Sequence, residues 1–396
     1  MKTLTKAAVS IIVPTFNRAR LLPATLDSLL AQTQAPLELI VVNDGCSDDT
    51  EAVLQAYQDR IVYVAQANGG KSSAINAALR IARGRYIWVF DDDDLACADS
   101  LARHVAVLDR RLEVGYTISG SFRCRSDADS GELTVVRAQP VRLFADDDDL
   151  LELLLSSYIA GPSTMIRAEL IARVGPYRED LVRVDDFEMA LRLALVSRPA
   201  RLDTPAPSYY RRWHPGPRGR LGVQFAYAES IARSRAEERM VMRDLAPTLP
   251  PRVYLPRAEW QATLDDSARC RAHLRCWTVA VQKGMWPEAA TEFAALRDLS
   301  AQLASLPASE LAWACRAFSD VHTLAEMHAT PAALDKLATM LRALWASRLR
   351  QAAQRQLYYH LRAAMRERDL GRLRLALALA WSLFGMVKNR RARAPH

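Results

Sequence analysis

Short, almost purely apolar segments recur through the first part of the chain and constrain the fold more than any other feature. They occupy residues 9–13, 37–42, 61–65 and 86–90. The stretches between them, at 21–30, 50–57 and 72–82, repeat apolar residues at helical spacing. Strands that are apolar on both faces and alternate with helices are typical of a parallel sheet covered on both sides. The sequence therefore predicts an α/β fold with a parallel-dominated sheet and flanking helices.

The polar residues that directly follow these strands are the informative ones for function. In open parallel sheets, ligands bind beyond the carboxyl ends of the strands. The predicted strands end in PTFN (14–17), NDG (43–45), NGGKS (68–72) and DDDD (91–94). The chain contains neither G-x-G-x-x-G nor G-x-x-x-x-G-K-[ST], so neither a dinucleotide-binding fold nor a P-loop is indicated.

The aspartate run at 91–94 requires an explanation, because adjacent carboxylates repel one another. A hard divalent cation that bridges to phosphate oxygens supplies one, since such a cation binds through one or two carboxylates plus phosphate and water. Side chains alternate along an extended chain, which places Asp91 and Asp93 on the same side. A solvated acidic loop is the alternative. The second run, 146–149, fits that alternative, because it precedes a helical pattern and complements the helix dipole.

The segments VSIIVPTFNR, VVNDGCSDDT and NGGKSSAINAALRIARGRYIWVFDDDD, in this order, resemble the family 2 inverting glycosyltransferases, which have the GT-A fold. The resemblance is close over the first hundred residues and looser up to residue 220. It implies a nucleotide-sugar donor, commonly a UDP-sugar, with Mn²⁺ or Mg²⁺ as cofactor. It also implies a hydroxyl acceptor on a glycan, a lipid-linked molecule or a protein, and a hexosyltransferase role in cell-surface polysaccharide or glycoconjugate synthesis.

Several donor-binding residues are implied by this resemblance. Pro14 and Thr15 match the donor-facing end of the first strand. Asp44 matches the carboxylate that contacts the uracil, although the preceding position, usually Asp in the family, is Asn43 here. Lys71 follows two glycines and is a candidate phosphate contact, with an ordinary surface lysine as the alternative.

The resemblance also assigns roles within the acidic run. Asp91 and Asp93 match the acidic positions of the family's D-x-D motif and are the predicted metal ligands. Asp92 stands where the family often has a small residue, and it is assigned to donor binding. Asp94 occupies a common further acidic position.

A catalytic base is expected in the segment VDDFEMALRL, residues 184–193. It resembles the family's ED-x-x-L-x-L-R-L pattern, with Asp185 in place of Glu. The second acidic residue of that pattern is the usual base, which corresponds to Asp186. A carboxylate suits this task, because it accepts the proton of the acceptor hydroxyl as that oxygen attacks. The alternative is that Asp185 and Asp186 merely favour a helix N-terminus.

A histidine in the stretch YYRRWHPG, residues 209–216, is a further candidate. In the family a similar Tyr–Arg–x–His stretch closes the donor site. His214 is therefore a candidate metal ligand or diphosphate contact. A structural or exposed histidine beside two prolines is the alternative.

The second part of the chain has a different character. Strand patterns disappear from residue 223, and Ala-, Leu- and Arg-rich helical segments of hairpin length follow. We expect a GT-A domain at 1–222 and a basic, all-α domain at 223–396, with a role in acceptor or membrane-surface binding. Residues 372–393 combine an apolar helix with basic residues, which suits either peripheral contact with a membrane or a packed final helix with a basic tail.

The cysteines and the apolar runs bear on the compartment. Six cysteines are present, without a C-x-x-C pair or a histidine cluster, so a zinc site is not indicated. Scattered single cysteines are typical of proteins in a reducing compartment. The N-terminal apolar stretch runs into Pro14 without a cleavage pattern, and no apolar run is long enough to cross a bilayer. These features predict a cytoplasmic protein, either dissolved or peripheral on the inner face of the membrane.

Two other functions are alternatives to a glycosyltransferase. A nucleotidyltransferase also binds a nucleotide and a metal on a parallel sheet, but it should have a Gly-, Arg- and Lys-rich loop after the first strand, which PTFNRARLL resembles poorly. A nucleic-acid-binding scaffold would use the positive charge of residues 223–396, which hold 26 Lys and Arg against 16 Asp and Glu, whereas residues 1–222 hold 27 against 29. That half has no recognisable reader motif, so no nucleic acid is expected as a partner.

Overall fold

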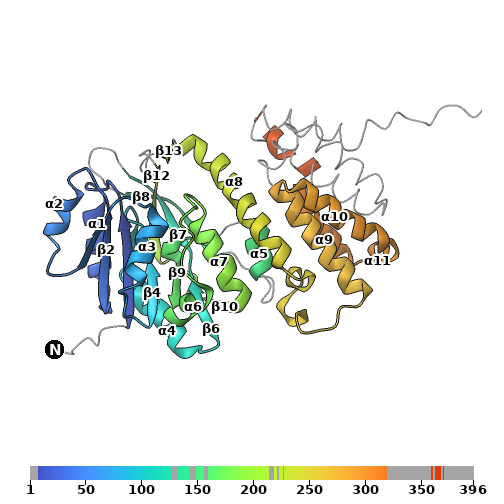
Figure 1. Cartoon of the computed structure of the whole chain (residues 1–396), viewed down its shortest axis with the longest axis horizontal. Helices are drawn as coiled ribbons and strands as arrows, with labels where there is room; N and C mark the ends of the chain where they lie inside the picture. Colours follow the sequence, from blue (N-terminus) through green and yellow to red (C-terminus); the bar gives the residue numbers. More distant parts are fainter. Residues whose placement is uncertain are drawn as a thin grey trace, which may run out of the picture. The chain divides into compact units, whose positions relative to one another are not determined.

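The computed structural model (Figure 1) describes residues 8–126, 133–141, 149–155, 159–213, 218–220, 223–225, 227–318, 358–359, 362–366 and 369. The chain divides into two compact units, Met1–Glu238 and Arg239–His396. The division falls inside helix α8 (Tyr227–Leu245), so this helix contributes residues to both units. The domain limits expected from the sequence, 1–222 and 223–396, remain a prediction.

A mixed seven-stranded sheet forms the centre of the N-terminal unit. Its strands are β1 (Val9–Thr15), β2 (Glu38–Asp44), β3 (Val62–Gln66), β4 (Tyr86–Val89), β6 (Val114–Ile118), β9 (Thr164–Arg167) and β10 (Arg198–Arg201). They follow the order β10-β6-β9-β4-β1-β2-β3. All neighbours are parallel except β9, which runs antiparallel to both β4 and β6.

Burial along the strands explains why their sequences are so apolar. Every residue of β1, β2 and β4 is buried, because these strands lie inside the sheet and both of their faces are covered. Strand β3 lies at the edge, and its residues alternate between partly buried and exposed. Three of the four apolar runs thus correspond to interior strands, as expected for a sheet that is covered on both sides, and the run at 61–65 corresponds to the edge strand β3.

Helices flank this sheet. They are α1 (Leu22–Leu30), α2 (Thr50–Gln55), α3 (Lys71–Leu79), α4 (Ser100–Arg110), α5 (Asp149–Leu155), α6 (Ala168–Val174) and α7 (Asp185–Val196), with a 3-10 turn at Gly161–Ser163. Helix α3 packs against β1 and β2, and α4 packs against β6. Asp149 opens α5, whereas the rest of the second aspartate run lies outside the described residues.

A second, four-stranded sheet lies beside the acidic run. It consists of β5 (Leu95–Ala96), β7 (Ser121–Ser126), β8 (Leu133–Gln139) and β11 (Tyr209–Trp213), in the order β5-β11-β7-β8. Because β5 directly follows residue 94 and pairs with β11, this sheet brings residues 209–213 next to the aspartates. A short hairpin, β12 (Arg218–Arg220) with β13 (Val223–Phe225), follows β11.

The C-terminal unit is helical wherever the structure describes a regular element. Helices α9 (Asp266–Lys283) and α10 (Trp286–Asp298) pack against each other across a turn at Gly284, whose φ of 70° suits glycine. They are followed by α11 (Ser300–Ser305) and α12 (Ala308–Ala314). The remaining 3-10 turns are Ala246–Thr248, Pro251–Tyr254, Arg257–Glu259 and Cys315–Phe318.

The predicted fold class is confirmed: a sheet with mostly parallel strands and flanking helices is followed by a helical region. Among the described helices, none combines the length and the apolar character that crossing a membrane requires. The segment 372–393, predicted to contact either a membrane or a neighbouring helix, lies outside the described residues.

Candidate functional site

The loops that follow β1, β2 and β4 are hydrogen-bonded to one another at one edge of the sheet. The amide of Phe16 donates to Oδ2 of Asp92 at 3.3 Å. The side-chain oxygen of Asn17 accepts from the amide of Ser47 at 2.8 Å. Asn17 has a positive φ of 54°, a conformation that Asn tolerates better than most residues. The polar strand ends of the sequence therefore form one continuous rim.

Three of the four aspartates at 91–94 gather on the same side of the chain. One carboxylate oxygen from each of Asp91, Asp93 and Asp94 lies within 4.8 Å of the others. Asp92 points the other way, toward the loop after β1, where its Oδ1 lies 3.7 Å from Nε of Arg18. Asp91 and Asp93 are thus on one side, as the alternation of an extended chain predicts, and Asp94 joins them.

Asp94 is the most buried member of this cluster, with 4% of its surface exposed. Its Oδ1 accepts a hydrogen bond from the backbone amide of Arg212 at 2.9 Å. Burial, with the charges of Asp93 and Asp91, raises the pKa of Asp94 well above its usual value. A cation beside these oxygens would remove the repulsion, and hard carboxylate ligands suit Mg²⁺ or Mn²⁺. The donor set therefore fits a divalent metal.

Three predicted donor-binding residues lie along β1 and the acidic run. Burial raises the pKa of the Asp92 carboxyl to about 7, while the charge of Arg18 and the nearby Thr15 side chain oppose that rise. Thr15 and Asp92 are therefore neighbours at the end of β1. Pro14 is buried within β1, in register with Val42 of β2. Pro14 thus shapes the strand end from inside the fold.

Lys71, the first residue of α3, connects the acidic run to the acidic pair of α7. Its Nζ lies 2.8 Å from Oδ1 of Asp91 and 3.5 Å from Oδ2 of Asp185. The charges of Asp185, Asp91 and Asp186 raise the pKa of Lys71 well above its usual value, although burial opposes this. The ammonium group is therefore protonated at neutral pH and stands between the two acidic groups.

The pKa of the Asp186 carboxyl group is shifted by its surroundings. Burial and the charge of Asp185 raise its pKa to about 7, while Lys71 lowers it. Asp186 is partly exposed, whereas Asp185 beside it is only 4% exposed. Asp186 also lines a cavity of 20 Å³ together with Tyr177 and apolar residues. A partly exposed carboxylate with a pKa near neutrality is suited to accept a proton.

The carboxylate of Asp44 is engaged by the loop between β3 and α3. Its Oδ1 accepts from Nε2 of Gln66 at 2.7 Å and from the amide of Gly69 at 2.9 Å. Its Oδ2 accepts from Nδ2 of Asn68 at 3.0 Å and from the amide of Gly70 at 2.8 Å. The residue is 2% exposed. Asp44 therefore organises the loop that presents Lys71, and contact with a nucleobase remains a prediction.

Two arginines and one aspartate belong to the site beyond the residues assigned from the sequence. The charge of Arg211 lowers the pKa of Asp186, and the amide of Arg212 binds Asp94. Asp94 was noted only as a further acidic position. The stretch 209–216 was expected to close the donor site, but no role was assigned to its arginines, and the pairing of β11 with β5 places them here. His214 lies outside the described residues, so its predicted role remains a prediction.

Comparison with known proteins identifies the N-terminal segment. The model of "Glycosyl transferase family 2" matches residues 10–175. An uncharacterized glycosyltransferase of Rickettsia prowazekii (strain Madrid E) is 30% identical over 191 residues, which are 48% of this chain and 59% of that protein. An uncharacterized glycosyltransferase of Haemophilus influenzae is 26% identical over 187 residues, 47% of this chain and 61% of that protein. The chain thus spans about three fifths of these relatives.

Solved structures with a similar chain course include S. aureus TarS 1-349. It has a TM-score of 0.47 and 17% sequence identity, with 88% of this chain and 90% of that chain covered. The resemblance to family 2 is confirmed for the matched segment, whereas inversion of configuration stays a prediction. Asp185 and Asp186 follow the matched range. Residues 10–175, which contain Asp44, Lys71 and the aspartates at 91–94, thus match a glycosyl transferase family 2 domain.

Proposed function

We propose that this protein is a metal-dependent, inverting glycosyltransferase of the hexosyltransferase type. It transfers a sugar from a nucleoside-diphosphate donor, with UDP as the expected nucleotide, to an acceptor hydroxyl. One observation carries the proposal: the carboxylate cluster Asp91, Asp93 and Asp94 meets the acidic pair of α7 across Lys71. The family match of residues 10–175 supports the same reaction class.

The donor diphosphate is proposed to lie at this cluster. Asp91 and Asp93 would hold Mn²⁺ or Mg²⁺, which neutralises charge on the leaving nucleoside diphosphate. Lys71 stands 2.8 Å from Asp91 and supplies a second positive charge to the same region. Thr15 and Asp92 form the neighbouring wall, and His214 is proposed as a further metal or diphosphate contact.

The chemical step assigned to Asp186 is proton removal. Its carboxylate accepts the proton of the acceptor hydroxyl as that oxygen forms a bond to the anomeric carbon. The bond from that carbon to the diphosphate breaks on the opposite face, so the configuration inverts. Asp185 has a supporting role, because it binds Lys71 and its negative charge raises the pKa of Asp186.

The proposed function is tested by measuring how the affinity for UDP depends on a divalent metal. We expect UDP affinity, measured calorimetrically, to fall at least tenfold when Mn²⁺ is replaced by a chelator, because the diphosphate loses its neutralising partner. Asp93→Ala should lower affinity similarly in the presence of Mn²⁺. The control is Asp99→Ala, which removes an aspartate whose side chain is 60% exposed and pairs with Arg103. Equal affinity under all these conditions would contradict the metal assignment.

Asp44 provides a test of the nucleotide. A carboxylate can accept a hydrogen bond from the ring N–H of uracil, a proton that cytosine lacks at that place. Two of its donors, Gln66 and Asn68, are side-chain amides that can rotate away, which leaves each carboxylate oxygen with one backbone donor and room for another. Asp44→Ala should therefore weaken UDP binding by about 1–3 kcal/mol and CDP binding less. Exposed Asp59→Ala is the control. Equal losses for UDP and CDP would leave Asp44 with a loop role alone.

The biological setting is proposed from the family resemblance. The acceptor would be a hydroxyl on a glycan, a lipid-linked molecule or a protein, and the product would enter cell-surface polysaccharide or glycoconjugate synthesis. We propose a cytoplasmic location, with residues 372–393 as the candidate contact to the inner face of the membrane. The basic composition of that segment supports the contact, because anionic headgroups attract it.

A further inference from the structure

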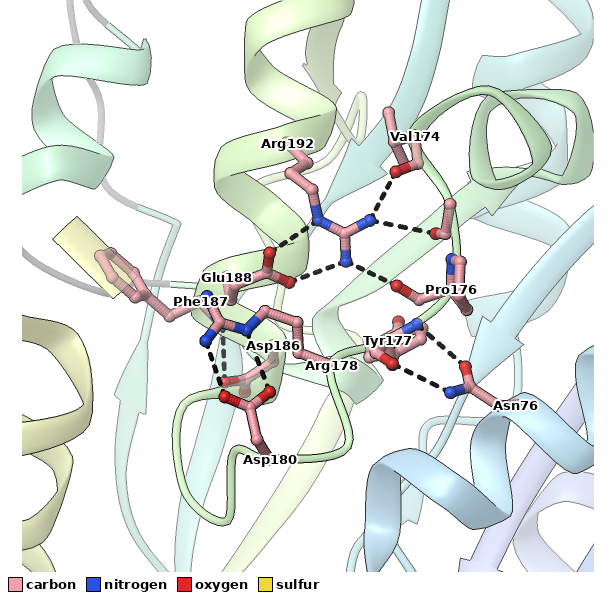
Figure 2. Close-up of polar contacts among 11 residues, drawn as sticks. Asn76, Val174, Pro176, Tyr177, Arg178, Asp180, Asp186, Phe187, Glu188 and Arg192 are labelled. Carbon is pink, nitrogen blue, oxygen red and sulfur yellow. Dashed lines mark hydrogen bonds and ion pairs between the residues drawn. The ribbon is translucent and has the colours of Figure 1, made fainter. Parts of the chain in front are cut away.

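The segment between α6 and α7 carries the acidic pair, and its first half is fixed by two neighbouring helices (Figure 2). The guanidinium of Arg192 donates to the carbonyls of Val174 at 2.7 Å, Gly175 at 3.1 Å and Pro176 at 2.8 Å. Glu188 orients that guanidinium through an ion pair of 2.7 Å. These contacts hold the beginning of the segment, about ten residues before Asp186.

The next residue along the segment is held by α3. Asn76 and Tyr177 exchange two hydrogen bonds of 2.9 Å, one from the Asn76 amide nitrogen to the Tyr177 carbonyl and one from the Tyr177 amide to Asn76 Oδ1 (Figure 2). Asn76 lies on the same helix as Lys71, which contacts Asp185. The helix that presents Lys71 is thus tied to the segment that presents the acidic pair.

The end of the segment is held by α8. Oε2 of Glu237 accepts hydrogen bonds from the backbone amides of Val182 at 3.0 Å and Arg183 at 2.8 Å. The residue is 8% exposed, and its Oε1 lies 3.3 Å from Nε of Arg233, one turn earlier on α8. A buried carboxylate that accepts two backbone hydrogen bonds makes strong, charge-assisted contacts. These amides immediately precede Val184, the N-cap of α7.

The Glu237 contact lies directly before the first turn of helix α7, whose body packs against α5 and α6. The N-cap of α7, Val184, makes no side-chain capping hydrogen bond, so the backbone before the first turn is held from outside the helix, by Glu237. Asp185 and Asp186 are the first two residues of that turn. A shift of the backbone at 182–183 would move both carboxylates relative to Lys71 and the acidic cluster. Misplacement of a catalytic group by about 1 Å can cost about a hundredfold in rate.

We propose that Glu237 is a positioning residue for the acidic pair: through the amides at 182 and 183, α8 sets where Asp186 points. The proposal rests on the proposed function, in which Asp186 is the base. It assigns a catalytic purpose to a residue that lies outside the family-matched segment 10–175 and on the helix that continues into the C-terminal unit.

The experiment compares three variants of the full chain. Glu237→Ala removes the acceptor and should lower kcat about 10- to 100-fold, with the KM for the donor within about twofold of wild type. Glu237→Gln keeps an oxygen that can accept from both amides, so it should restore most of the rate. Glu229→Ala removes an exposed glutamate from the same helix and should behave as wild type. Hydrogen exchange of the amides at 182–187 should be faster in Glu237→Ala alone.

The outcomes separate this proposal from the proposed function. If the wild type turns over no nucleotide sugar, the function fails, and hydrogen exchange still reports whether Glu237 holds the segment. An active wild type with an unchanged kcat in Glu237→Ala overturns the positioning role. Equal loss of kcat in Glu237→Ala and Glu237→Gln, accompanied by a lower Tm, also overturns it, because that pattern describes general destabilisation.

Discussion

Replacement of Asp186 by Asn is expected to lower the turnover number by roughly 10²–10⁴, the range for loss of a positioned general base. The amide has nearly the shape of the carboxylate, so the fold should be retained. Donor affinity should change little, because the proposed nucleotide and metal contacts lie on other strand ends and the base acts in the transition state. Steady-state kinetics, combined with a titration of UDP, measures both quantities.

Asp185→Asn is the matched control for this prediction. Asp185 is 4% exposed and lies 3.5 Å from Lys71, whereas Asp186 is partly exposed. The Asn variant at 185 should therefore cost less turnover than the Asn variant at 186. The opposite ranking would exchange the roles within the pair, and full activity in both variants would place the base elsewhere.

The pH dependence of the reaction should report the same carboxyl group. Burial and Asp185 raise the pKa of Asp186 to about 7, and only the deprotonated form can accept a proton. We therefore expect kcat/KM to fall as the pH drops through a midpoint at or below this value, because a cation bound near Asp91 would lower the pKa. The acid limb should be absent from the residual activity of Asp186→Asn.

Glu310→Ala is expected to destabilise the helical unit by about 3–5 kcal/mol, the usual cost of leaving one partner of a buried ion pair uncompensated. Glu310 of α12 binds Arg275 of α9 through two hydrogen bonds, of 2.8 and 3.0 Å. The two side chains are only 10% and 7% exposed. Amide exchange of α9 measures this stability without requiring the whole chain to unfold in one transition.

Two further variants make this prediction specific. Asp298→Ala breaks a contact with Arg297 in which both side chains are more than two thirds exposed, so it should cost under about 1 kcal/mol. Replacement of both buried partners, Arg275→Met with Glu310→Leu, should recover most of the loss, because neither charge then remains buried. A small effect of Glu310→Ala would mean that solvent or the remaining contacts of Arg275, among them the Trp313 ring, compensate its charge.

Much of the sheet could be predicted from local sequence. Runs such as 9–13 and 86–90 are apolar at every position because the interior strands β1 and β4 are covered on both faces. Strand β9 was not predicted, because it is short and its place between β4 and β6 depends on pairing with distant residues. The single antiparallel strand among parallel neighbours is therefore a long-range property.

The candidate site likewise has one part that could be predicted from local sequence and another that depends on the tertiary structure. Asp91, Asp93 and the acidic pair at 185 and 186 could be found in the sequence, because a carboxylate run after a buried strand and a pair opening a helix are local patterns. That Lys71 contacts both Asp91 and Asp185 could not be predicted from the sequence, because about 90 residues separate the two aspartates along the chain.

The direction of each side chain depended on packing as well. Asp92 turns toward β1 while Asp94 joins the metal-binding candidates, and the donors of the β3–α3 loop surround Asp44. Glu237 reaches the segment that carries Asp186 only because α8 folds back onto the backbone at 182 and 183. Local chemistry thus selects the residue types at the strand ends, and hydrogen bonds between distant segments fix which of them meet, because burial leaves each polar group dependent on its partners.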